Sequence, residues 1–444
     1  ESASASSVVV RPTAIEFTQP VIPNSPTNGL SMALGTSIAE YDLKFGGIQK
    51  ALIRNDKQLI VYFEDKVGQI GILSELAKSQ SGDVTYQTDA LFNGINYYAY
   101  DGGVGLNPES ISYYDNTQYF LSPRNNAVCR LADDGITEIS KWGMTKWFNE
   151  NLDVKDNYIG TLYAQGVYDE RHESYILSLN QTITSTSFSN QATGIEESLD
   201  ATITNIGNPT GLFQSPVCTQ AWMYDTSAGW VLVDLLSFTI ISQNVVSISW
   251  YNGEGIPIVL AADVTQIDFI LYTGTLMFSE PANAWASFLD FNTEKMATCG
   301  VDFVSFKSGA LWLHNSNETR GSYYGVEYPA EVTIPFNTSP DVQKKFENVE
   351  QEANSIWKSD TDGDITTVGG QTSLLEEAFY EEFQPNEFAA GFRQDSSTPN
   401  ETYPLLNGYD LRDRVLSMRL VNANTTKATL EAVAVSFSVS ESSQ

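Results

Sequence analysis

The sequence has few basic residues for its length. It holds 24 Lys and Arg against 55 Asp and Glu, which gives a net charge of -31 on 444 residues. A chain this acidic cannot gain the counterion release that drives general nucleic-acid binding, and anionic membranes do not attract it. Nonspecific binding to DNA or to lipid is therefore not expected.

Cysteine is scarce as well, and no apolar run is long. Cys129, Cys218 and Cys299 lie far apart and form no C-x-x-C pair, so the sequence predicts neither a disulfide framework nor a structural zinc site. We expect all three to be buried thiols. The longest apolar stretch, 230–241, is interrupted by Asp234 and is too short to span a bilayer, so we predict no membrane anchor.

What is present is a composition suited to a folded core. Hydrophobic residues make up 42% of the chain and aromatic residues 12%, whereas only 18% are charged. The acidity therefore reflects a shortage of Lys and Arg and not a disordered acidic tail. The chain begins with Glu1 and a Ser/Ala-rich run, from which we expect a processed product or a fragment.

Most of the secondary-structure signals have a period of two residues, which is typical of strands. Pairs of alternating segments flank polar turns at several places, and each such pair predicts a β-hairpin. The predicted hairpins are 58–63 with 67–73, 116–121 with 127–131, 167–169 with 175–179, 222–225 with 230–233, and 302–306 with 310–314.

The hairpins carry aromatic residues at recurring intervals. From Tyr119 to Tyr168, Tyr224 and Phe303 the intervals are 49, 56 and 79 residues. This spacing fits four-stranded propeller blades with insertions, because one blade cannot bury both of its faces and must stack on its neighbours. The sequence predicts an all-β fold with a β-propeller that can be incomplete in this chain, and a β-sandwich is the competing architecture.

The sequence suggests three domains. An extended N-terminal segment covers 1–45, propeller blades with insertions cover 46–328, and a β-rich, sandwich-like C-terminal domain covers 329–444. One helix is expected over 141–152, with Ser140 as its cap.

Strands are expected in the last domain too. Segments 331–336 and 346–350 are predicted as strands, although the second also fits a helical face. The β-branched segments 414–420 and 429–439 are predicted to pair with each other around an Asn-rich turn.

Neither histidine has the surroundings of a catalytic group. His172 lies in the charged turn 169–173, and His314 ends a strand, where we expect a hydrogen-bonded structural role. No nucleophile, phosphate-loop or dinucleotide motif is complete. The sequence therefore predicts no catalytic residue, no cofactor-binding residue and no cofactor, and the protein is not expected to be an enzyme.

Three aspartates resemble the start of a calcium loop. Asp360, Asp362 and Asp364 occupy alternate positions, but Gly363 falls in fourth place instead of sixth. Gln371 stands where the loop needs a bidentate glutamate. We therefore assign no metal ligand and favour a solvated turn over a looser calcium site.

Two other classes of function remain open. A propeller-type glycosidase needs a pair of carboxylates, but no pair stands out among 55 acidic residues. A carbohydrate-binding adhesin would instead expose aromatic platforms without paired acids.

Several ordered motifs resemble a known family. They are Gly105-Leu-Asn-Pro-Glu-Ser110, Tyr119-Phe-Leu-Ser-Pro-Arg-Asn-Asn-Ala-Val-Cys-Arg-Leu131, Trp147-Phe148, Val167-Tyr-Asp169, Trp285-Ala-Ser-Phe288 and Leu311-Trp-Leu-His-Asn315. In this order they resemble the propeller of tail-nozzle proteins of short-tailed bacteriophages, and in particular the muzzle or stabilisation proteins of crAss-like phages. The resemblance covers roughly residues 55–440.

The resemblance implies a structural protein of the virion tail. Its copies would assemble into a ring of about six, which would contact the portal or adaptor ring and neighbouring tail proteins. The ring would form a conduit for genome ejection, through which DNA passes without specific binding. An acidic lining fits this role because it repels the phosphate backbone, whereas a basic lining would hold it.

Overall fold

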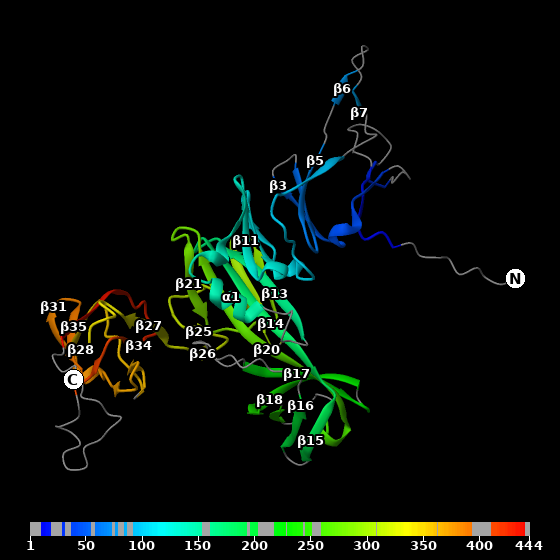
Figure 1. Cartoon of the computed structure of the whole chain (residues 1–444). Helices are drawn as coiled ribbons and strands as arrows, with labels where there is room; N and C mark the ends of the chain where they lie inside the picture. Colours follow the sequence, from blue (N-terminus) through cyan, green and yellow to red (C-terminus); the bar gives the residue numbers. More distant parts are fainter. Residues whose placement is uncertain are drawn as a thin grey trace. The chain divides into compact units, whose positions relative to one another are not determined.

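The computed structural model consists almost entirely of β-strands (Figure 1). It describes residues 10–18, 29–31, 37–54, 58–72, 76–78, 84–86, 92–152, 160–192, 196–202, 217–227, 229–242, 245–250, 259–307, 309–361, 363–392 and 410–439. Within these ranges the paired strands are antiparallel, and α1 (Thr145–Leu152) is the one α-helix. The all-β prediction is confirmed. The chain divides into two compact units, Glu1–His314 and Asn315–Gln444.

Four antiparallel sheets follow one another along the first unit. The first sheet consists of β3 (Ile48–Arg54), β4 (Gln58–Phe63), β5 (Val67–Ile72) and β8 (Phe92–Tyr97), with the hairpin of β6 (Leu76–Lys78) and β7 (Val84–Tyr86) between β5 and β8. The second sheet consists of β9 (Ser112–Tyr114), β10 (Thr117–Ser122), β11 (Ala127–Ala132) and β12 (Gly135–Glu138). In both sheets the strands pair in chain order.

The next two sheets continue this order. The third consists of β13 (Gly160–Asp169), β14 (Ser174–Ser185), β20 (Val264–Ser279) and β21 (Ala284–Leu289). The fourth consists of β22 (Lys295–Cys299), β23 (Asp302–Lys307) and β24 (Ala310–Leu313). The described residues thus contain three successive sheets of four strands and one of three.

An insertion separates β14 from β20. It contains β15 (Ser187–Ala192), β16 (Glu197–Thr202), β17 (Val217–Asp225), β18 (Gly229–Ser242) and β19 (Val245–Trp250). Because β17 also pairs with β20, the insertion and the third sheet share one nine-stranded sheet. The insertion has its own core, in which Leu199, Ile248 and Trp250 are almost completely buried.

Successive sheets pack face to face because alternate residues of a strand point to opposite faces. On β10, Phe120 packs toward the first sheet, where its ring lies 5.3 Å from that of Tyr62. Tyr119 and Leu121 point the other way and share a cluster with Leu177 of the third sheet. The second sheet is therefore buried on both faces.

The first sheet is also covered on its other face, by the N-terminal segment. Strands β1 (Ala14–Glu16) and β2 (Ile38–Glu40) pair there, and η2 (Leu43–Phe45) follows. Ile15, Tyr41 and Phe45 pack against Val61 and Phe63 of β4.

All five predicted hairpins are confirmed. They correspond to β4–β5, β10–β11, β13–β14, β17–β18 and β23–β24. The described sheets do not close into a ring, so the propeller remains a prediction.

The predicted helix begins later than expected. Residues Ile139–Lys141 form a 3-10 turn, and α1 starts only at Thr145. Between them Gly143 adopts a φ of 80°, which a continuous right-handed helix does not allow. The prediction that Ser140 caps the helix was therefore wrong.

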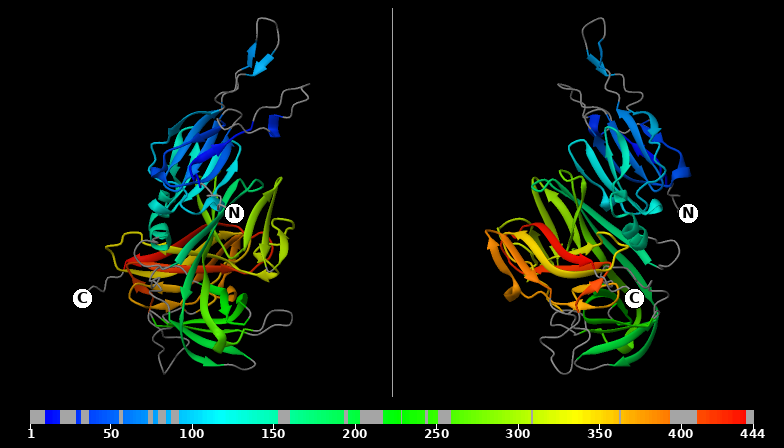
Figure 2. Two further views of the ribbon diagram at one scale, coloured as in Figure 1. Left: turned by 90° about the vertical axis from the view of Figure 1, so that its right-hand side faces the viewer. Right: turned by 60° about the vertical axis from the view of Figure 1, so that its left-hand side comes forward.

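In the second unit two sheets share one core (Figure 2, yellow to red). One sheet consists of β27 (Ala330–Phe336), β34 (Leu416–Asn422), β29 (Ile365–Thr367) and β30 (Thr372–Ser373). The other consists of β28 (Lys344–Ala353), β31 (Glu381–Gln384), β32 (Glu387–Gly391), β33 (Arg412–Asp413) and β35 (Leu430–Val439). A separate hairpin pairs β25 (Ser322–Tyr323) with β26 (Val326–Glu327). The strand predictions for 331–336 and 346–350 are confirmed.

The predicted pairing of the last two strands was wrong. β34 pairs with β27 and β29, whereas β35 pairs with β28 in the other sheet. The side chain of Asn422 donates to Ser355 Oγ and to the Ile356 carbonyl, and Asn354 bonds the backbone of Lys427. These bonds hold the connection between β34 and β35 so that the chain crosses to the other sheet and does not turn back along β34.

The cysteine prediction holds only in part. Cys129 is completely buried in β11, whereas Cys299 at the end of β22 is exposed. The side chain of Cys218 lies outside the described residues. No helix of the described chain combines the length and the apolar character needed to cross a bilayer.

Gly166 allows β13 to approach the turn before the second sheet. A Cβ at this position would lie 2.1 Å from the backbone oxygen of Ser110. We expect Gly166→Ala to lower the free energy of unfolding by about 1–3 kcal/mol, because the backbone must shift to relieve the overlap. Thermal or denaturant unfolding measures this change.

Gly94 in β8 provides the matched control. A Cβ there meets no atom within 4 Å. Gly94→Ala should change the stability by less than about 0.5 kcal/mol. Equal stabilities of the two variants would contradict the close approach at Gly166.

Candidate functional site

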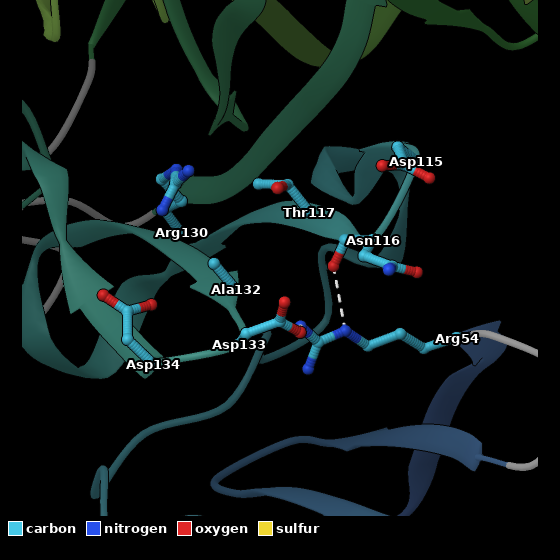
Figure 3. A pocket seen from close by; sticks show the side chains of 8 residues that line it. All are labelled: Arg54, Asp115, Asn116, Thr117, Arg130, Ala132, Asp133 and Asp134. Carbon is cyan, nitrogen blue, oxygen red and sulfur yellow. Dashed lines mark hydrogen bonds and ion pairs between the residues drawn. The ribbon is translucent and has the colours of Figure 1, made fainter.

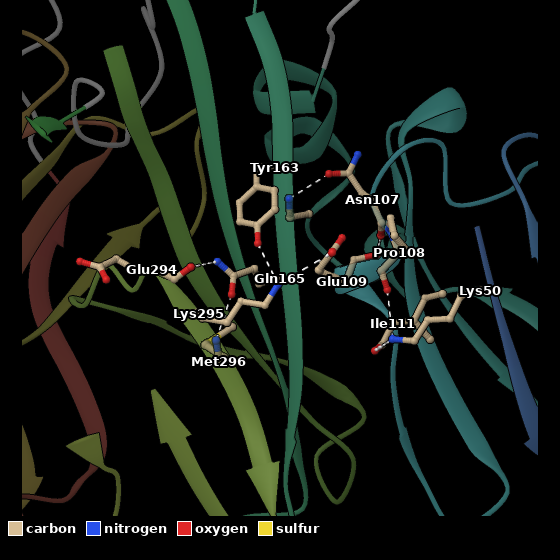
Figure 4. Close-up of polar contacts among 12 residues, drawn as sticks. Lys50, Asn107, Pro108, Glu109, Ile111, Tyr163, Gln165, Glu294, Lys295 and Met296 are labelled. Carbon is tan, nitrogen blue, oxygen red and sulfur yellow. Dashed lines mark hydrogen bonds and ion pairs between the residues drawn. The ribbon is translucent and has the colours of Figure 1, made fainter. Parts of the chain in front are cut away.

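One short segment connects the first strands of neighbouring sheets (Figure 4). This 107–111 segment contains a 3-10 turn, Pro108–Ser110, in which proline at the first position pre-sets the backbone angle φ. Asn107 Oδ1 accepts a hydrogen bond from the backbone N–H of Ala164 in β13, at 2.9 Å. The amine of Lys50 in β3 donates to the carbonyls of Pro108 and Ile111, at 3.2 and 3.3 Å. The segment therefore joins the first and third sheets at the start of the second.

The fourth sheet is bonded to the third sheet next to the 107–111 segment. Gln165 in β13 is 1% exposed, and its amide donates to the Glu294 carbonyl at 2.8 Å while its oxygen accepts from Met296 N at 2.9 Å. The amine of Lys295 donates to the Tyr163 hydroxyl at 3.0 Å. The first strand of each sheet therefore lies beside the 107–111 segment or beside a strand that contacts it (Figure 4).

Two of the few lysines of the chain meet here. Lys295 Nζ lies 3.8 Å from Glu109 Oε1. Burial lowers the pKa of Lys50; the charge of Glu109 opposes this shift, and the charge of Lys295 adds to it. The amines contact protein oxygens, so this cluster acts by holding strands together.

A second set of contacts joins the second and third sheets. Four tyrosine rings stack in the order Tyr114, Tyr168, Tyr119, Tyr175, with centroid distances of 4.7, 5.7 and 4.9 Å. Next to them, Glu280 accepts hydrogen bonds from Arg130 Nε at 2.8 Å and from the Tyr119 hydroxyl. Burial and the bond to Glu280 raise the pKa of Tyr119 well above its usual value.

Removing Glu280 tests this contact. Glu280→Ala leaves the partly buried guanidinium of Arg130 without its carboxylate, and we expect a loss of about 1–3 kcal/mol in unfolding free energy. Asp65→Ala is the control, because Asp65 lies 3.7 Å from Arg124 and both side chains are 47% exposed. Its effect should stay below about 1 kcal/mol. A control that costs as much as Glu280→Ala would contradict the prediction.

A polar pocket of about 370 Å³ is lined by residues of the first and second sheets (Figure 3). On its wall Arg54, which is 6% exposed, donates to the Asn116 carbonyl at 2.8 Å and to Asp133 Oδ1 at 2.6 Å. The pocket is also lined by Arg130, Asp115 and Asp134. It therefore carries charges of both signs, and a glycosidase interpretation of the chain would have to use its carboxylates.

The two histidines have different surroundings. His172 Nδ1 lies 2.8 Å from the buried carboxylate of Asp169, and the His172 side chain is 45% exposed. His314 stacks on Phe303 with centroids 4.1 Å apart, and its Nε2 lies 2.6 Å from Ser305 Oγ. Burial lowers the pKa of His314 to about 4, although the charge of Asp169 opposes this shift. His314 therefore has the hydrogen-bonded role expected from the sequence.

His314 should make the stability depend on pH. Its pKa in the folded protein lies below the unfolded value of 6.5, so the unfolded chain binds the proton more readily between these values. The corresponding stability is present above about pH 6.5 and is lost as the pH falls toward about 4. Denaturant unfolding at a series of pH values should show a shallower fall for His314→Gln than for the unchanged protein. Parallel curves would contradict this assignment.

The carboxylate of Asp364 is engaged by protein donors. Its Oδ2 accepts from the backbone N–H groups of Asp360 and Thr361 at 2.7 and 2.8 Å, and its Oδ1 accepts from Arg419 at 2.8 Å. Despite partial burial, these hydrogen bonds lower its pKa. Asp362 lies outside the described residues. In the described part of the chain no group of three or more acidic, histidine or cysteine residues is arranged to hold a metal ion.

The sheets and their contacts define an all-β module held together by packing and by polar bonds between strands. The family model for the crassvirus muzzle protein matches residues 35–309, more than half of the chain, and the chain belongs to this family. No curated protein matches the chain. The resemblance and the location in the virion tail are thereby confirmed, and the protein is a structural component of a phage tail.

Sequence reasoning missed the 107–111 segment as a connecting element. Residues 105–110 stood out only as one of the family-like motifs. The only local sign of this element is an asparagine followed by a proline. Its partners are distant in sequence: Ala164 is 57 residues from Asn107, and Lys50 is 58 residues from Pro108. Local pattern cannot identify partners at that separation.

Proposed function

We propose that this muzzle protein forms part of a ring-shaped tail nozzle through which the genome is ejected. Copies of the chain surround a central channel, in a ring of about six. The ring contacts the portal or adaptor ring and neighbouring tail proteins, and DNA passes without specific binding. The observation that carries the proposal is the family match together with the stacked sheets.

A β-propeller is the architecture that we propose for the first unit. Three features support it: the strands of each sheet pair in chain order, each sheet packs on the next, and the first strands meet around the 107–111 segment. Blades of a propeller have the same arrangement, with their first strands nearest the axis. The four sheets would then be consecutive blades of a propeller that needs more blades to close.

The charge of the chain supports passage of DNA. Many of its basic side chains pair with nearby carboxylates, as in Arg54–Asp133, Arg130–Glu280 and Arg419–Glu331. With 55 acidic against 24 basic residues, 31 carboxylates have no lysine or arginine to match them one to one. Such groups on a channel wall repel phosphate and let a polyanion slide.

Size measurement and imaging test the ring. We expect light scattering of the purified chain, or of tails released from virions, to give a multiple of the 48.9 kDa chain mass. Negative-stain images should show rings with a central channel. A monomer under all conditions, absent from isolated tails, would refute the proposal. Oligosaccharide hydrolysis that Asp115→Asn abolishes would instead favour the glycosidase alternative.

A further inference from the structure

Both histidines of the chain lie where the third sheet meets the fourth, a contact that we call the third–fourth joint. His172 belongs to the turn between β13 and β14 of the third sheet, and His314 directly follows β24 of the fourth. Between them, at the end of β13, the buried carboxylate of Asp169 lies 2.8 Å from His172 Nδ1, and its charge also acts on His314. The sequence contains two histidines, so this joint holds every imidazole of the protein.

The third–fourth joint also contains direct bonds between the two sheets. Thr298 Oγ1 of β22 donates to the Tyr168 carbonyl of β13 at 3.1 Å. Closer to solvent, Arg171 of the β13–β14 turn pairs with Asp302 of β23, and both side chains are partly exposed. All of these groups belong to the first unit. The joint is therefore a contact within one compact unit.

His314 is enclosed by groups of both sheets. Its ring stacks on Phe303 with centroids 4.1 Å apart, and the ring of Phe291 lies 5.0 Å away. The Phe291 carbonyl accepts a hydrogen bond from Thr275 Oγ1 of β20 at 2.8 Å, which anchors this residue to the third sheet. His314 Nε2 lies 2.6 Å from Oγ of the completely buried Ser305. Separation of the two sheets would therefore bring water to the imidazole.

A neutral imidazole suits these surroundings better than a charged one. The ring nitrogen of a neutral histidine can accept or donate a hydrogen bond, whereas a protonated ring can only donate. Burial lowers the pKa of His314 to about 4, although the charge of Asp169 opposes this shift. Between that value and the ordinary value of 6.5, the proton binds more readily to His314 in an opened joint than in a closed one. Acid therefore favours opening.

The other charges around His314 are mainly negative. The register places Lys295 and Asp302 on the face of the fourth sheet opposite to Ser305. The remaining charged residues of the neighbouring elements are Glu170, Arg171, Glu173, Asp290, Glu294 and Lys307. Negative charges offset part of the effect of burial, but the pKa of His314 still lies well below 6.5. They do not cancel the preference for a neutral ring.

His172 responds to acid in the opposite way. Its side chain is 45% exposed, so it can take up a proton without any opening of the joint. The protonated ring then forms an ion pair with Asp169, whose other oxygen accepts from the backbone N–H of Arg171 at 3.1 Å. Protonation of His172 therefore strengthens the turn. The tendency to open comes from His314.

We propose that the third–fourth joint is acid-sensitive: in mildly acidic solution His314 takes up a proton, and the fourth sheet separates from the third before the rest of the first unit unfolds. The clusters that join the first sheet to the second and the second to the third contain no histidine and keep their contacts. The protein then has a low-pH state in which the stacked series ends at the third sheet. The proposal concerns the first unit alone and does not rest on the proposed ring.

Hydrogen exchange of the full chain, followed by mass spectrometry, tests the proposal. Exchange rates at pH 7 and pH 5 are divided by the intrinsic rates at the same pH, which gives the opening constant of each segment. For residues 295–307 this constant should rise at least about tenfold, because only the opened joint binds the proton readily in this range. For residues 117–131 of the second sheet it should change less than about threefold. Equal changes in both segments, or none in either, would overturn the proposal.

His314→Gln and His172→Gln form a matched pair of variants. Glutamine at position 314 offers an amide to Ser305 but cannot take up a proton, so the opening constant of residues 295–307 should stay within about twofold between pH 7 and pH 5. His172→Gln removes the other imidazole and should keep the rise of at least about tenfold. A rise that persists in His314→Gln, or that disappears in His172→Gln, contradicts the assignment to His314.

An NMR titration of the unchanged protein checks the assignment without any effect of substitution on folding. Labelled imidazoles give two signals because the chain has two histidines, and the signal that is lost in His172→Gln identifies the other as His314. In the closed joint His314 should titrate below about pH 5. A His314 signal that titrates near 6.5 while residues 295–307 remain protected would show that the closed joint accepts the proton, and the proposal would be wrong.

Discussion

The first unit depends on strands that are buried on both sides. In β10, Phe120 packs into one core while Tyr119 and Leu121 pack into the next. A sheet with two apolar faces cannot be stable alone, so each sheet of the series stabilises its neighbours. This explains why polar side chains between sheets, such as Gln165 and Glu280, bond backbone groups and cations.

The sequence allowed the local pairing to be predicted, but not the order of the sheets. Hairpins such as β10–β11 are short and carry an alternating pattern, so a window of a dozen residues contains both partners. The pairing of β14 with β20 spans the whole insertion, and nothing in either strand identifies the other. The wrong pairing of β34 with β35 has the same origin. Their common alternation specifies two strands but not the sheet to which each belongs.

The candidate site was less predictable than the fold. Cys299 was expected to be buried because cysteine usually is, yet it is exposed at the end of β22. The predicted start of the helix was wrong because Gly143 has a positive φ, which ends the helical geometry there even though the apolar residues keep a helical spacing. The side chains that hold the 107–111 segment bond backbone carbonyl and N–H groups, and every sequence contains those. Residue type alone gives no signal for such contacts.

The long strands β14 and β20 have a mechanical consequence. They contain 12 and 16 residues and run without a break in the chain from the third sheet into the insertion. β20 alone spans about 50 Å at the usual rise per residue. A force applied along these strands loads many hydrogen bonds in parallel, as shear, whereas a force at a hinge would open bonds one after another. The insertion is therefore attached to the third sheet as a stiff arm, and a force applied to it is transmitted to the stacked sheets.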